Sequence, residues 1–326
     1  MKYGSVEIPT PLVLAPMAGV TDRQFRLVLR RVGGVGLVTM EFISSEALTR
    51  GNERTIKMMH YAEEERPLSI QIYGSHPDRM AEAARIVESI GADICDINMG
   101  CPANKVLRGC AGCALMGDLD LAQSIISTVR KVISIPLTVK FRAGIRDDAQ
   151  NYIELGKICQ GEGVNAVALH PRTAKQMYRG SADWSRIARL KEALDIPVVG
   201  NGDVTTPDGA LKMFKETGCD AVMIGRASMR NPWIYRQIVD KMEGREPVEP
   251  TLDDRRDVIL AHFNMLMKQE DDPKFALHKL RTFTGWYTHG LPGGKTLRAK
   301  INELQDPPAF FDAVEAFFEE ARHRAA

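Results

Sequence analysis

Cysteine, net charge and long apolar runs are all scarce in this chain. Six of 326 residues are cysteine, which is too few for a disulfide scaffold. Lys and Arg total 43 against 42 Asp and Glu, so the net charge of +1 gives no overall sign of a polyanionic partner. No apolar run approaches the ~20 residues that cross a bilayer. The first ten residues do not resemble a secretory signal peptide. We therefore expect a cytoplasmic protein with reduced cysteines and no membrane segment.

The composition itself describes a folded globular chain. Hydrophobic residues make up 44% of the sequence and charged residues 26%. A disordered chain would combine low hydrophobicity with a high net charge, and this chain has neither. There is enough apolar material for one large core and a smaller second core.

Eight short apolar runs recur along the first part of the chain, and each is continuous rather than alternating, as in strands buried on both faces. They are Pro11–Ala15, Gly36–Met40, Leu68–Ile72, Asp93–Asn98, Pro136–Phe141, Asn165–His170, Pro197–Gly200 and Asp220–Ile224. Amphipathic stretches between them, at Pro77–Ile90, Asp118–Val132 and Ala149–Glu162, predict helices. Eight alternating units over about 230 residues predict a TIM (β/α)8 barrel, with a doubly wound open sheet as the alternative.

The remainder of the chain has a different pattern. Residues 243–251 are polar with two prolines, which indicates a linker. Beyond it, helical stripes such as Leu260, Phe263, Leu266 and Met267, and Phe310, Val314, Phe317 and Phe318, predict a small all-α bundle of four helices. We therefore predict a barrel domain over 1–242 and a helical domain over 252–326.

Polar residues follow most of the predicted strands, and in a barrel all strand ends meet at one face. The most informative of these segments ends the fourth strand, where Asn98 precedes a Gly100-Cys101-Pro102 turn. A free thiol is mostly protonated at neutral pH, so Cys101 can donate a proton. Cys101 is therefore the candidate general acid.

Other strand ends supply groups suited to a flat, anionic ligand. Gln71 offers a carboxamide, and Lys140 interrupts an apolar run, so its ammonium needs an anion nearby. His170 ends the sixth strand. Glycine-rich loops follow the seventh and eighth strands, where barrels commonly bind phosphate through backbone N–H groups.

Two motifs are weaker than they look. Gly33-Gly34-Val35-Gly36 resembles a dinucleotide loop but precedes a strand, so we interpret it as a turn. Cys110 and Cys113 form a CxxC pair near Cys95 and Cys101. No second pair or histidine pair completes a zinc or iron–sulfur spacing, so we predict no metal.

Taken together, these segments resemble the tRNA-dihydrouridine synthase family. The shared wording runs from APMAGVTDRQFR at 15–26 through QIYG, DINMGCPANKV, VKFRAG, LHPRTAKQMYRG and GNGDV to IGRASMRNP at 224–232, and it is most like the bacterial B-type subgroup. The resemblance implies an FMN enzyme that reduces the 5,6 double bond of a tRNA uridine, with NADPH as reductant. It points to a D-loop uridine, with position 17 as the expectation. The pair Cys110 and Cys113 is not part of the shared pattern.

The resemblance also implies roles for individual residues. Cys101 would protonate C5 of the uracil while reduced flavin delivers hydride to C6. The positions that match cofactor-binding residues are Pro16, Met17, Ala18, Gln71, Lys140, His170, Asn201, Gly202, Asp203, Gly225 and Arg226. Asn98, Arg142, Arg172, Lys175 and Arg179 are the expected substrate-binding residues.

The charge distribution within the chain favours an RNA partner more than the total does. Residues 172–191 hold six basic residues and one acid, and residues 274–300 hold six basic residues and no acid. The second segment also holds Phe275, Phe283 and Trp286, which we assign to the bundle core. Acidic flanks, −3 over 252–273 and −4 over 301–326, offset these segments. The near-zero total is therefore a cancellation, and tRNA is the expected partner, with no obligate protein partner inferred.

The sequence leaves two alternatives. One is a flavin oxidoreductase acting on a free pyrimidine or enone, as in the dihydroorotate dehydrogenase or old-yellow-enzyme groups. The other is an RNA-binding relative that has lost its chemistry, which the presence of Cys101, Lys140 and Gln71 disfavours.

Overall fold

The computed structural model describes residues 1–269 and 273–325, without the side chains of 269, 273–275 and 325. Lys274 and Phe275 of the second basic segment therefore lie outside the described side chains.

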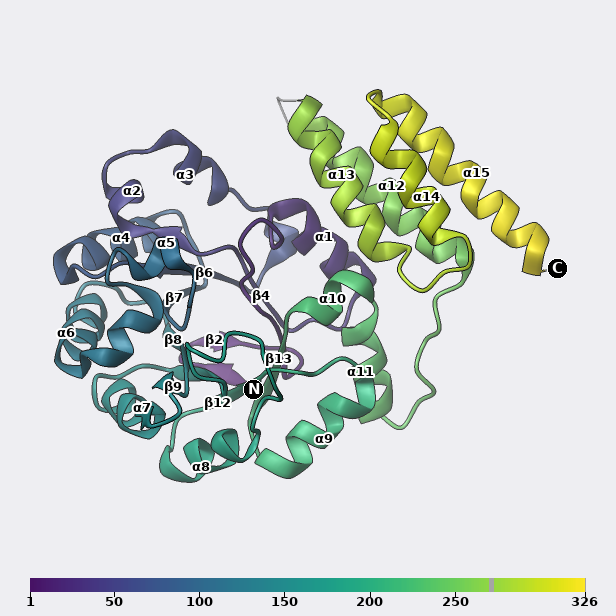
Figure 1. The fold of residues 1–326 in the computed structure, drawn as a ribbon. Coiled ribbons are helices and arrows are strands. Elements are labelled where there is room, and N and C mark those ends of the chain that lie inside the picture. Colours follow the sequence, from purple (N-terminus) through teal and green to yellow (C-terminus); the bar gives the residue numbers. More distant parts are fainter. Residues whose placement is uncertain (270–272, 326) are drawn as a thin grey trace.

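Eight parallel strands form a closed ring at the centre of the larger part of the chain (Figure 1). They are β3 Leu12–Leu14, β4 Leu37–Thr39, β6 Leu68–Tyr73, β7 Ile94–Met99, β8 Leu137–Arg142, β11 Ala166–His170, β12 Val198–Asn201 and β13 Ala221–Ile224. β13 pairs with β3 and β4 with β6, so the ring has no open edge. A short strand, β5 Ile43–Ser44, also pairs with β6. The TIM barrel is confirmed, and the open sheet is excluded because it would leave two edge strands unpaired.

Helices surround this ring, as Figure 1 shows. They are α1 Arg23–Val32, α2 Ser45–Thr49, α3 Glu53–Met58, α4 Pro77–Ser89, α5 Asn104–Leu107, α6 Leu119–Arg130, α7 Tyr152–Gly161, α8 Ser185–Ala193, α9 Pro207–Thr217, α10 Arg226–Arg230 and α11 Ile234–Met242. Short 3-10 helices lie at Glu63–Glu65 and Gly112–Gly117. Asp118 caps α6 by accepting the Leu121 N–H, and Thr206 caps α9. The strands are mostly apolar because one face meets these helices and the other fills the barrel.

One predicted helix begins later than its sequence pattern indicates. Ala149–Gln150 is strand β10, which pairs with β9 Gly144–Arg146, and α7 starts only at Tyr152. Gly144 has a φ of +155°, and a Cβ there would lie 2.2 Å from the Ala149 carbonyl oxygen. The hairpin is built around this close backbone approach, which amphipathic periodicity does not register.

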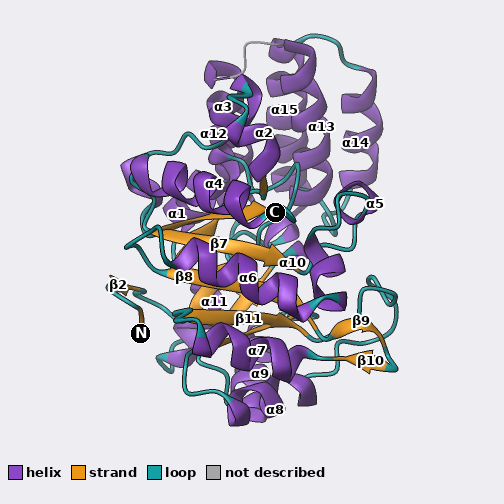
Figure 2. Cartoon of the chain, turned by 90° about the vertical axis from the view of Figure 1, so that its left-hand side faces the viewer, coloured by secondary structure: helices purple, strands orange, loops and turns teal. Residues whose placement is uncertain are grey.

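The two ends of the barrel carry different structures (Figure 2). A hairpin of β1 Lys2–Tyr3 and β2 Val6–Glu7 lies at the amino end of the strands, and the β9–β10 hairpin lies at the carboxyl end. Tyr3 is 2% exposed and packs inside the ring with Val13 and Val199. The amino end is therefore closed by the chain itself, which leaves the carboxyl end for a ligand.

The Gly33-Gly34-Val35-Gly36 segment is a turn between α1 and β4, as predicted. Gly33 and Gly34 have φ values of +96° and +86°. A Cβ on Gly34 would lie 2.3 Å from the backbone nitrogen of Arg236, and one on Gly36 would lie 1.9 Å from the Thr10 carbonyl oxygen. Close packing against neighbouring backbone therefore explains these glycines.

Four helices follow the barrel in the described residues: α12 Leu252–Gln269, α13 Pro273–Tyr287, α14 Gly294–Glu303 and α15 Pro307–Ala325. Residues of both predicted stripes are buried in their core, including Phe263, Leu266, Phe310 and Phe318. α12 packs against α1 and α13 against α10, beside the barrel (Figure 1). Phe283, also buried, lies 5.6 Å from Phe25 of α1 between ring centroids. The apolar core thus continues from the barrel into the bundle.

An ion pair crosses the same junction. Asp22 caps α1 by accepting the Phe25 N–H, and its second carboxylate oxygen lies 2.9 Å from Nζ of Lys279 on α13. Both side chains are mostly buried, 10% and 15% exposed.

This double use of Asp22 predicts an additive loss of stability. Asp22→Asn keeps a good helix cap and removes the charge, and we expect it to lower the free energy of unfolding by about 1 kcal/mol. Asp22→Ala removes cap and charge, so the expected loss is about 2 kcal/mol. Urea unfolding of both variants measures this difference. Equal losses in the two variants would show that the cap contributes nothing, and no loss in Asp22→Asn would show that the pair with Lys279 contributes nothing.

None of the helices in the described part of the chain combines the length and apolar character that a membrane crossing needs.

Candidate active site

The turn that carries Cys101 leaves the carboxyl end of β7 and is held by the last polar residue of that strand. Oδ1 of Asn98 accepts hydrogen bonds from the backbone N–H groups of Gly100 (3.1 Å) and Cys101 (2.9 Å). Nδ2 of Asn98 donates to Oε1 of Gln71 at 2.7 Å. Asn98 is 6% exposed, whereas Cys101 is only partly buried. The thiol therefore sits on a fixed turn, and Asn98 has one amide proton left for a ligand.

Arg142, at the end of β8, fixes the same turn from the other side. Its Nε donates to the Gly100 carbonyl at 3.0 Å, and its Nη1 donates to the carbonyls of Thr173 and Met177 at 3.1 and 2.7 Å. The side chain is 2% exposed. Arg142 is predicted to bind substrate, and Nη2 is the part of its guanidinium that these hydrogen bonds leave available for that contact. The observed contacts instead join the Cys101 turn to residues 173–177.

Arg172 is a second buried arginine for which the structure shows protein partners. Its Nη1 and Nη2 donate to the two carboxylate oxygens of Asp203 at 2.9 and 2.7 Å. Nε donates to the carbonyl of Arg179, and Nη2 also donates to that of Gly180. With 2% exposure, Arg172 holds the loop after β11 in place rather than presenting charge to solvent. Direct contact between Arg172 and the substrate stays a prediction.

The cations around the site determine the protonation of its histidine. His170, at the end of β11, is 8% exposed. Burial, and then the positive charges that begin with Lys140, hold the pKa of His170 far below its ordinary value. Its Nε2 lies 3.4 Å from Nη1 of Arg172, which can only donate. His170 is therefore neutral with its proton on Nδ1, which can donate to a ligand.

Lys140 lies on β8, in register with Asn98 on β7. Burial, and after it the positive charge of Arg142, lower the pKa of Lys140, and Asp96 opposes both, so that the resulting pKa is about 8. Its ammonium remains protonated at neutral pH. It is poised to gain from an anion, as the sequence predicts.

The loops after β12 and β13 are shaped by glycine and by Asp203. Asn201 is 8% exposed and donates its Nδ2 to the Met223 carbonyl at 2.8 Å. A Cβ on Gly202, at φ +122°, would lie 3.3 Å from the His170 ring. Asp203 accepts the N–H of Ala182 as well as the Arg172 pair, and these bonds hold its pKa below the usual value against the effect of burial. Its carboxylate therefore accepts hydrogen bonds from protein groups, and its predicted part in the phosphate-side loop stays a prediction.

Arg226, which follows Gly225, differs from the buried arginines because it is 59% exposed. Its guanidinium lies 3.8 Å from Asp203 and 4.8 Å from the centroid of the Tyr178 ring. Lys175 and Arg179 are exposed on the same loop as Tyr178. These three cations are the accessible positive groups that the sequence predicted here.

The loop after β3, containing Pro16, Met17 and Ala18, reaches the same mouth. Pro16 and Met17 are partly buried and Ala18 is exposed. The Met17 carbonyl accepts the N–H groups of Val20 and Thr21, and the Met17 N–H donates to Oγ1 of Thr21. Sulfur of Met17 lies close to Gly225. The first and last strands thus contribute adjacent backbone to the site.

Three residues of this region escaped the sequence analysis. Glu41, after β4, accepts the Gly19 N–H, and burial raises its pKa. Tyr178 is 54% exposed between Arg142 and Arg226. Asp96 lies buried within β7. The reasoning applied to Lys140, a charge inside an apolar run, would have found Asp96. The aromatic residue between Lys175 and Arg179 would have indicated Tyr178.

The two cysteines of the CxxC pair, Cys110 and Cys113, differ in solvent exposure. Cys110 is exposed at φ +52°, whereas Cys113 is buried and donates its backbone N–H to the Cys101 carbonyl. Across the residues that the structure describes, no three His, Cys, Asp or Glu side chains are grouped to hold a metal ion.

Comparison with known proteins identifies the family. Residues 13–322 match the model of the family described as dihydrouridine synthase. The chain is 39% identical to tRNA-dihydrouridine synthase B of Xanthomonas campestris pv. campestris, over the whole of both chains. It is 38% identical to the Pseudomonas aeruginosa protein of the same name, over 99% of this chain and 97% of that one. A probable tRNA-dihydrouridine synthase of Mycobacterium tuberculosis is 39% identical, over 92% and 80%.

Solved structures add support for the fold alone. A 2-naphthoyl-CoA reductase aligns with a TM-score of 0.57 at 15% identity, over 75% of this chain and 52% of that one. Histamine dehydrogenase from Rhizobium aligns with a TM-score of 0.54 at 13% identity, over 81% and 50%. This chain therefore spans about half of each. The family match over nearly the full length is decisive: the chain belongs to the dihydrouridine synthase family.

Proposed function

We propose that this chain is a flavin-dependent tRNA-dihydrouridine synthase that reduces the 5,6 double bond of a D-loop uridine in tRNA. The observation that carries the proposal is the Cys101 thiol, partly exposed on a turn fixed by Asn98 and Arg142 and close to Lys140. A thiol near a cation can donate a proton to carbon while an anionic ligand is bound nearby. NADPH is the proposed reductant, and the cytoplasm, where tRNA is found, is the proposed location.

The residues at the barrel mouth fit FMN by their chemistry. Lys140 offers a cation and His170 a neutral N–H, which suit the polar edge of a flat ring. Gln71 is buried and hydrogen-bonded to Asp96 and Asn98, which leaves it one amide proton for that edge. Arg226 and the backbone of Gly202 and Gly225 suit the phosphate. Pro16, Met17 and Ala18 would lie beside the ring, and Asn201 and Asp203 would hold the phosphate loops. When bound, FMN supplies the hydride.

The protein's own groups then have separate tasks. Cys101 holds the proton that C5 of the uracil receives, and the Asn98 amide is available to orient the base. The uridine must leave its base stack to reach Cys101, so the surrounding loops have to bind the nucleic acid backbone. Lys175 and Arg179, exposed beside the mouth, are the proposed phosphate contacts.

Mapping of dihydrouridine in tRNA from a strain that lacks this protein tests the assignment. We expect one D-loop position, uridine 17, to lose the modification, and the purified protein to restore it with NADPH. Turnover of free uracil but not of undermodified tRNA would instead favour an oxidoreductase of free pyrimidines. A protein that takes up no FMN would favour an RNA-binding relative without chemistry.

The RNA contact predicts a change in salt dependence. Lys175→Ala and Arg179→Ala should each weaken tRNA binding roughly tenfold, because each removes a charged hydrogen bond to phosphate. Each should also lower the slope of log K against log salt by about 1. Filter binding from low to high salt measures both effects. Lys212→Ala, on the barrel exterior at α9 and 64% exposed, is the matched control. An unchanged slope in both loop variants would place the RNA surface elsewhere.

A further inference from the structure

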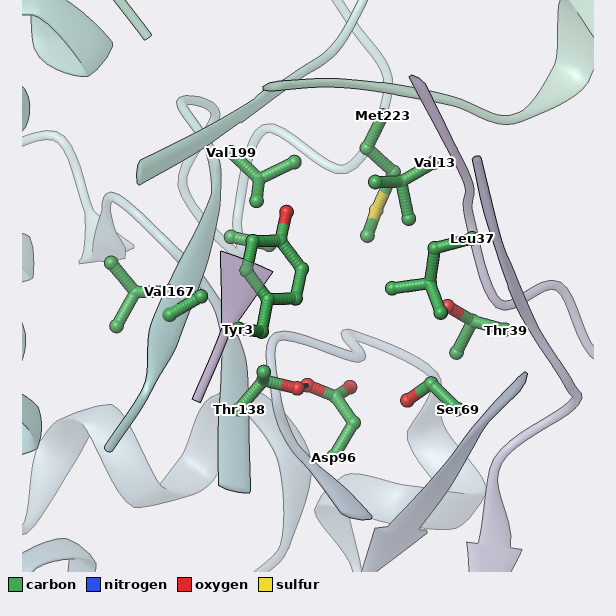
Figure 3. Close-up of a pocket in the computed structure, with 12 residues that line it drawn as sticks. Tyr3, Val13, Leu37, Thr39, Ser69, Asp96, Thr138, Val167, Val199 and Met223 are labelled. Atoms are coloured by element: carbon green, nitrogen blue, oxygen red, sulfur yellow. Dashed lines mark hydrogen bonds between the residues drawn. The ribbon is translucent and has the colours of Figure 1, made fainter. Parts of the chain in front are cut away.

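A buried acid lies below the candidate active site, in the middle of β7. Asp96 is 6% exposed and lines a small cavity of about 20 Å³ inside the barrel, together with Tyr3, Ser69 and Thr138 (Figure 3). Asp96 and Thr138 point toward one another across adjacent strands. A buried carboxylate is costly unless its oxygens receive hydrogen bonds, so its partners indicate why it is there.

Both oxygens of Asp96 have a donor. Oγ1 of Thr138 donates to Oδ1 at 2.5 Å, and Nε2 of Gln71 donates to Oδ2 at 2.5 Å. Burial raises the pKa of Asp96, and the hydrogen bonds from Thr138 and Gln71 oppose this rise. The resulting pKa is about 6. At neutral pH the group is therefore mostly ionised and can only accept.

The Gln71 bond begins a chain of hydrogen bonds that ends at the catalytic turn. Because Gln71 presents its amide nitrogen to Asp96, its Oε1 faces Asn98 and accepts Nδ2 at 2.7 Å. Asn98 therefore presents Oδ1 to the turn, where it accepts the N–H groups of Gly100 and Cys101. Each amide orientation follows from the previous one, with an acceptor-only carboxylate at one end and backbone donors at the other.

We propose that Asp96 is a positioning residue for Cys101: its carboxylate sets the orientation of Gln71 and Asn98, and through them the place of the thiol. This inference rests on the proposed function of Cys101 as the acid. Asp96 itself touches neither the thiol nor the mouth of the barrel. Without the Asp96 carboxylate, the side-chain amides of Gln71 and Asn98 can flip. Asn98 would then present an NH2 donor to the backbone N–H groups of Gly100 and Cys101, which cannot accept a hydrogen bond.

The test compares four variants that differ in what they leave of the chain. Asp96→Leu removes both hydrogen bonds, and Asp96→Asn keeps the size but allows either amide orientation. Thr138→Val removes the bond that is not part of the chain to Cys101. Asp93→Asn is the matched control, because Asp93 precedes the same strand at its amino end and binds Arg66 and the Leu68 N–H.

Two measurements apply to all four. The rate at which iodoacetamide alkylates Cys101 in FMN-free protein is followed by mass spectrometry of its peptide, because Cys110 is also exposed. Single-turnover reduction of tRNA by the pre-reduced holoenzyme is measured with tRNA affinity, which separates the chemical step from binding. We expect Asp96→Leu to slow turnover on the order of 10²-fold, as misplacement of a reacting group does. The alkylation rate should change and tRNA affinity should stay constant.

The expected order is a graded one. Asp93→Asn should resemble the wild type, and Thr138→Val and Asp96→Asn should lie between it and Asp96→Leu, because Thr138→Val leaves one oxygen of Asp96 without its donor. If Asp96→Leu does not fold, Asp96→Asn with wild-type alkylation and turnover overturns the proposal. If it folds, values equal to those of Asp93→Asn overturn it. If the alkylation rate of Cys101 differs between the wild type and the Asp96 variants but the wild type does not reduce tRNA, the positioning role is supported and the proposed function is refuted.

Discussion

Replacing Cys101 with alanine should give a protein that still binds FMN and tRNA but reduces uridine about 10²–10⁴ times more slowly, the usual contribution of a general acid. The substitution removes the proton donor and little else. The turn itself is held by Asn98 and Arg142 through backbone groups of Gly100 and Cys101, which alanine retains. Flavin absorbance, tRNA affinity and single-turnover rate measure the three properties separately.

The matched control is Cys110→Ser. Cys110 lies nine residues further along the chain, is exposed, and makes no part of the proposed site. Its substitution should leave the rate unchanged. Reduction at near wild-type rate by Cys101→Ala would show that another group, or water, donates the proton. Loss of FMN in the same variant would show instead that the residue serves the fold of the site.

Lys140→Met should slow flavin reduction by NADPH by about 10²–10³-fold, the loss typical when a donor to developing negative charge is removed. Burial already lowers the pKa of this lysine to about 8, so its charge is held at a cost that an anionic ligand offsets. The cofactor gains negative charge on reduction, and methionine cannot balance it. The midpoint potential of the bound flavin should therefore become more negative.

Spectroelectrochemical titration measures the potential, and stopped-flow absorbance measures the rate. Lys157→Met removes an equal charge from the exposed surface of α7 and should change neither. A Lys140→Met protein whose potential matches that of Lys157→Met would remove Lys140 from the flavin site.

The barrel could be predicted because its strands are buried on both faces. Runs such as Pro136–Phe141 and Asp220–Ile224 are continuous for this reason, and the observed strands lie within about one residue of them. The β9–β10 hairpin could not be predicted in the same way. It depends on contact between Gly144 and Ala149 across a turn, and no periodicity records such a contact.

The candidate site shows a similar division. Strand ends indicated that Gln71, Asn98, Cys101, Lys140 and His170 would gather, because topology alone brings the ends of parallel strands together. Which of the basic residues face solvent could not be inferred from the sequence. Arg142, Arg172 and Lys175 look equivalent in the sequence, yet the first two are satisfied by carbonyls and by Asp203, partners that only the folded loops supply.

Arg142 also connects two loops of the candidate site. Its three carbonyl partners belong to two loops, the turn of Gly100 and the segment from Thr173 to Met177. One guanidinium therefore joins the turn of Cys101 to the loop that carries Lys175 and Arg179. If tRNA binds this loop as proposed, Arg142 is the residue that sets the spacing between the phosphate contacts and the Cys101 thiol.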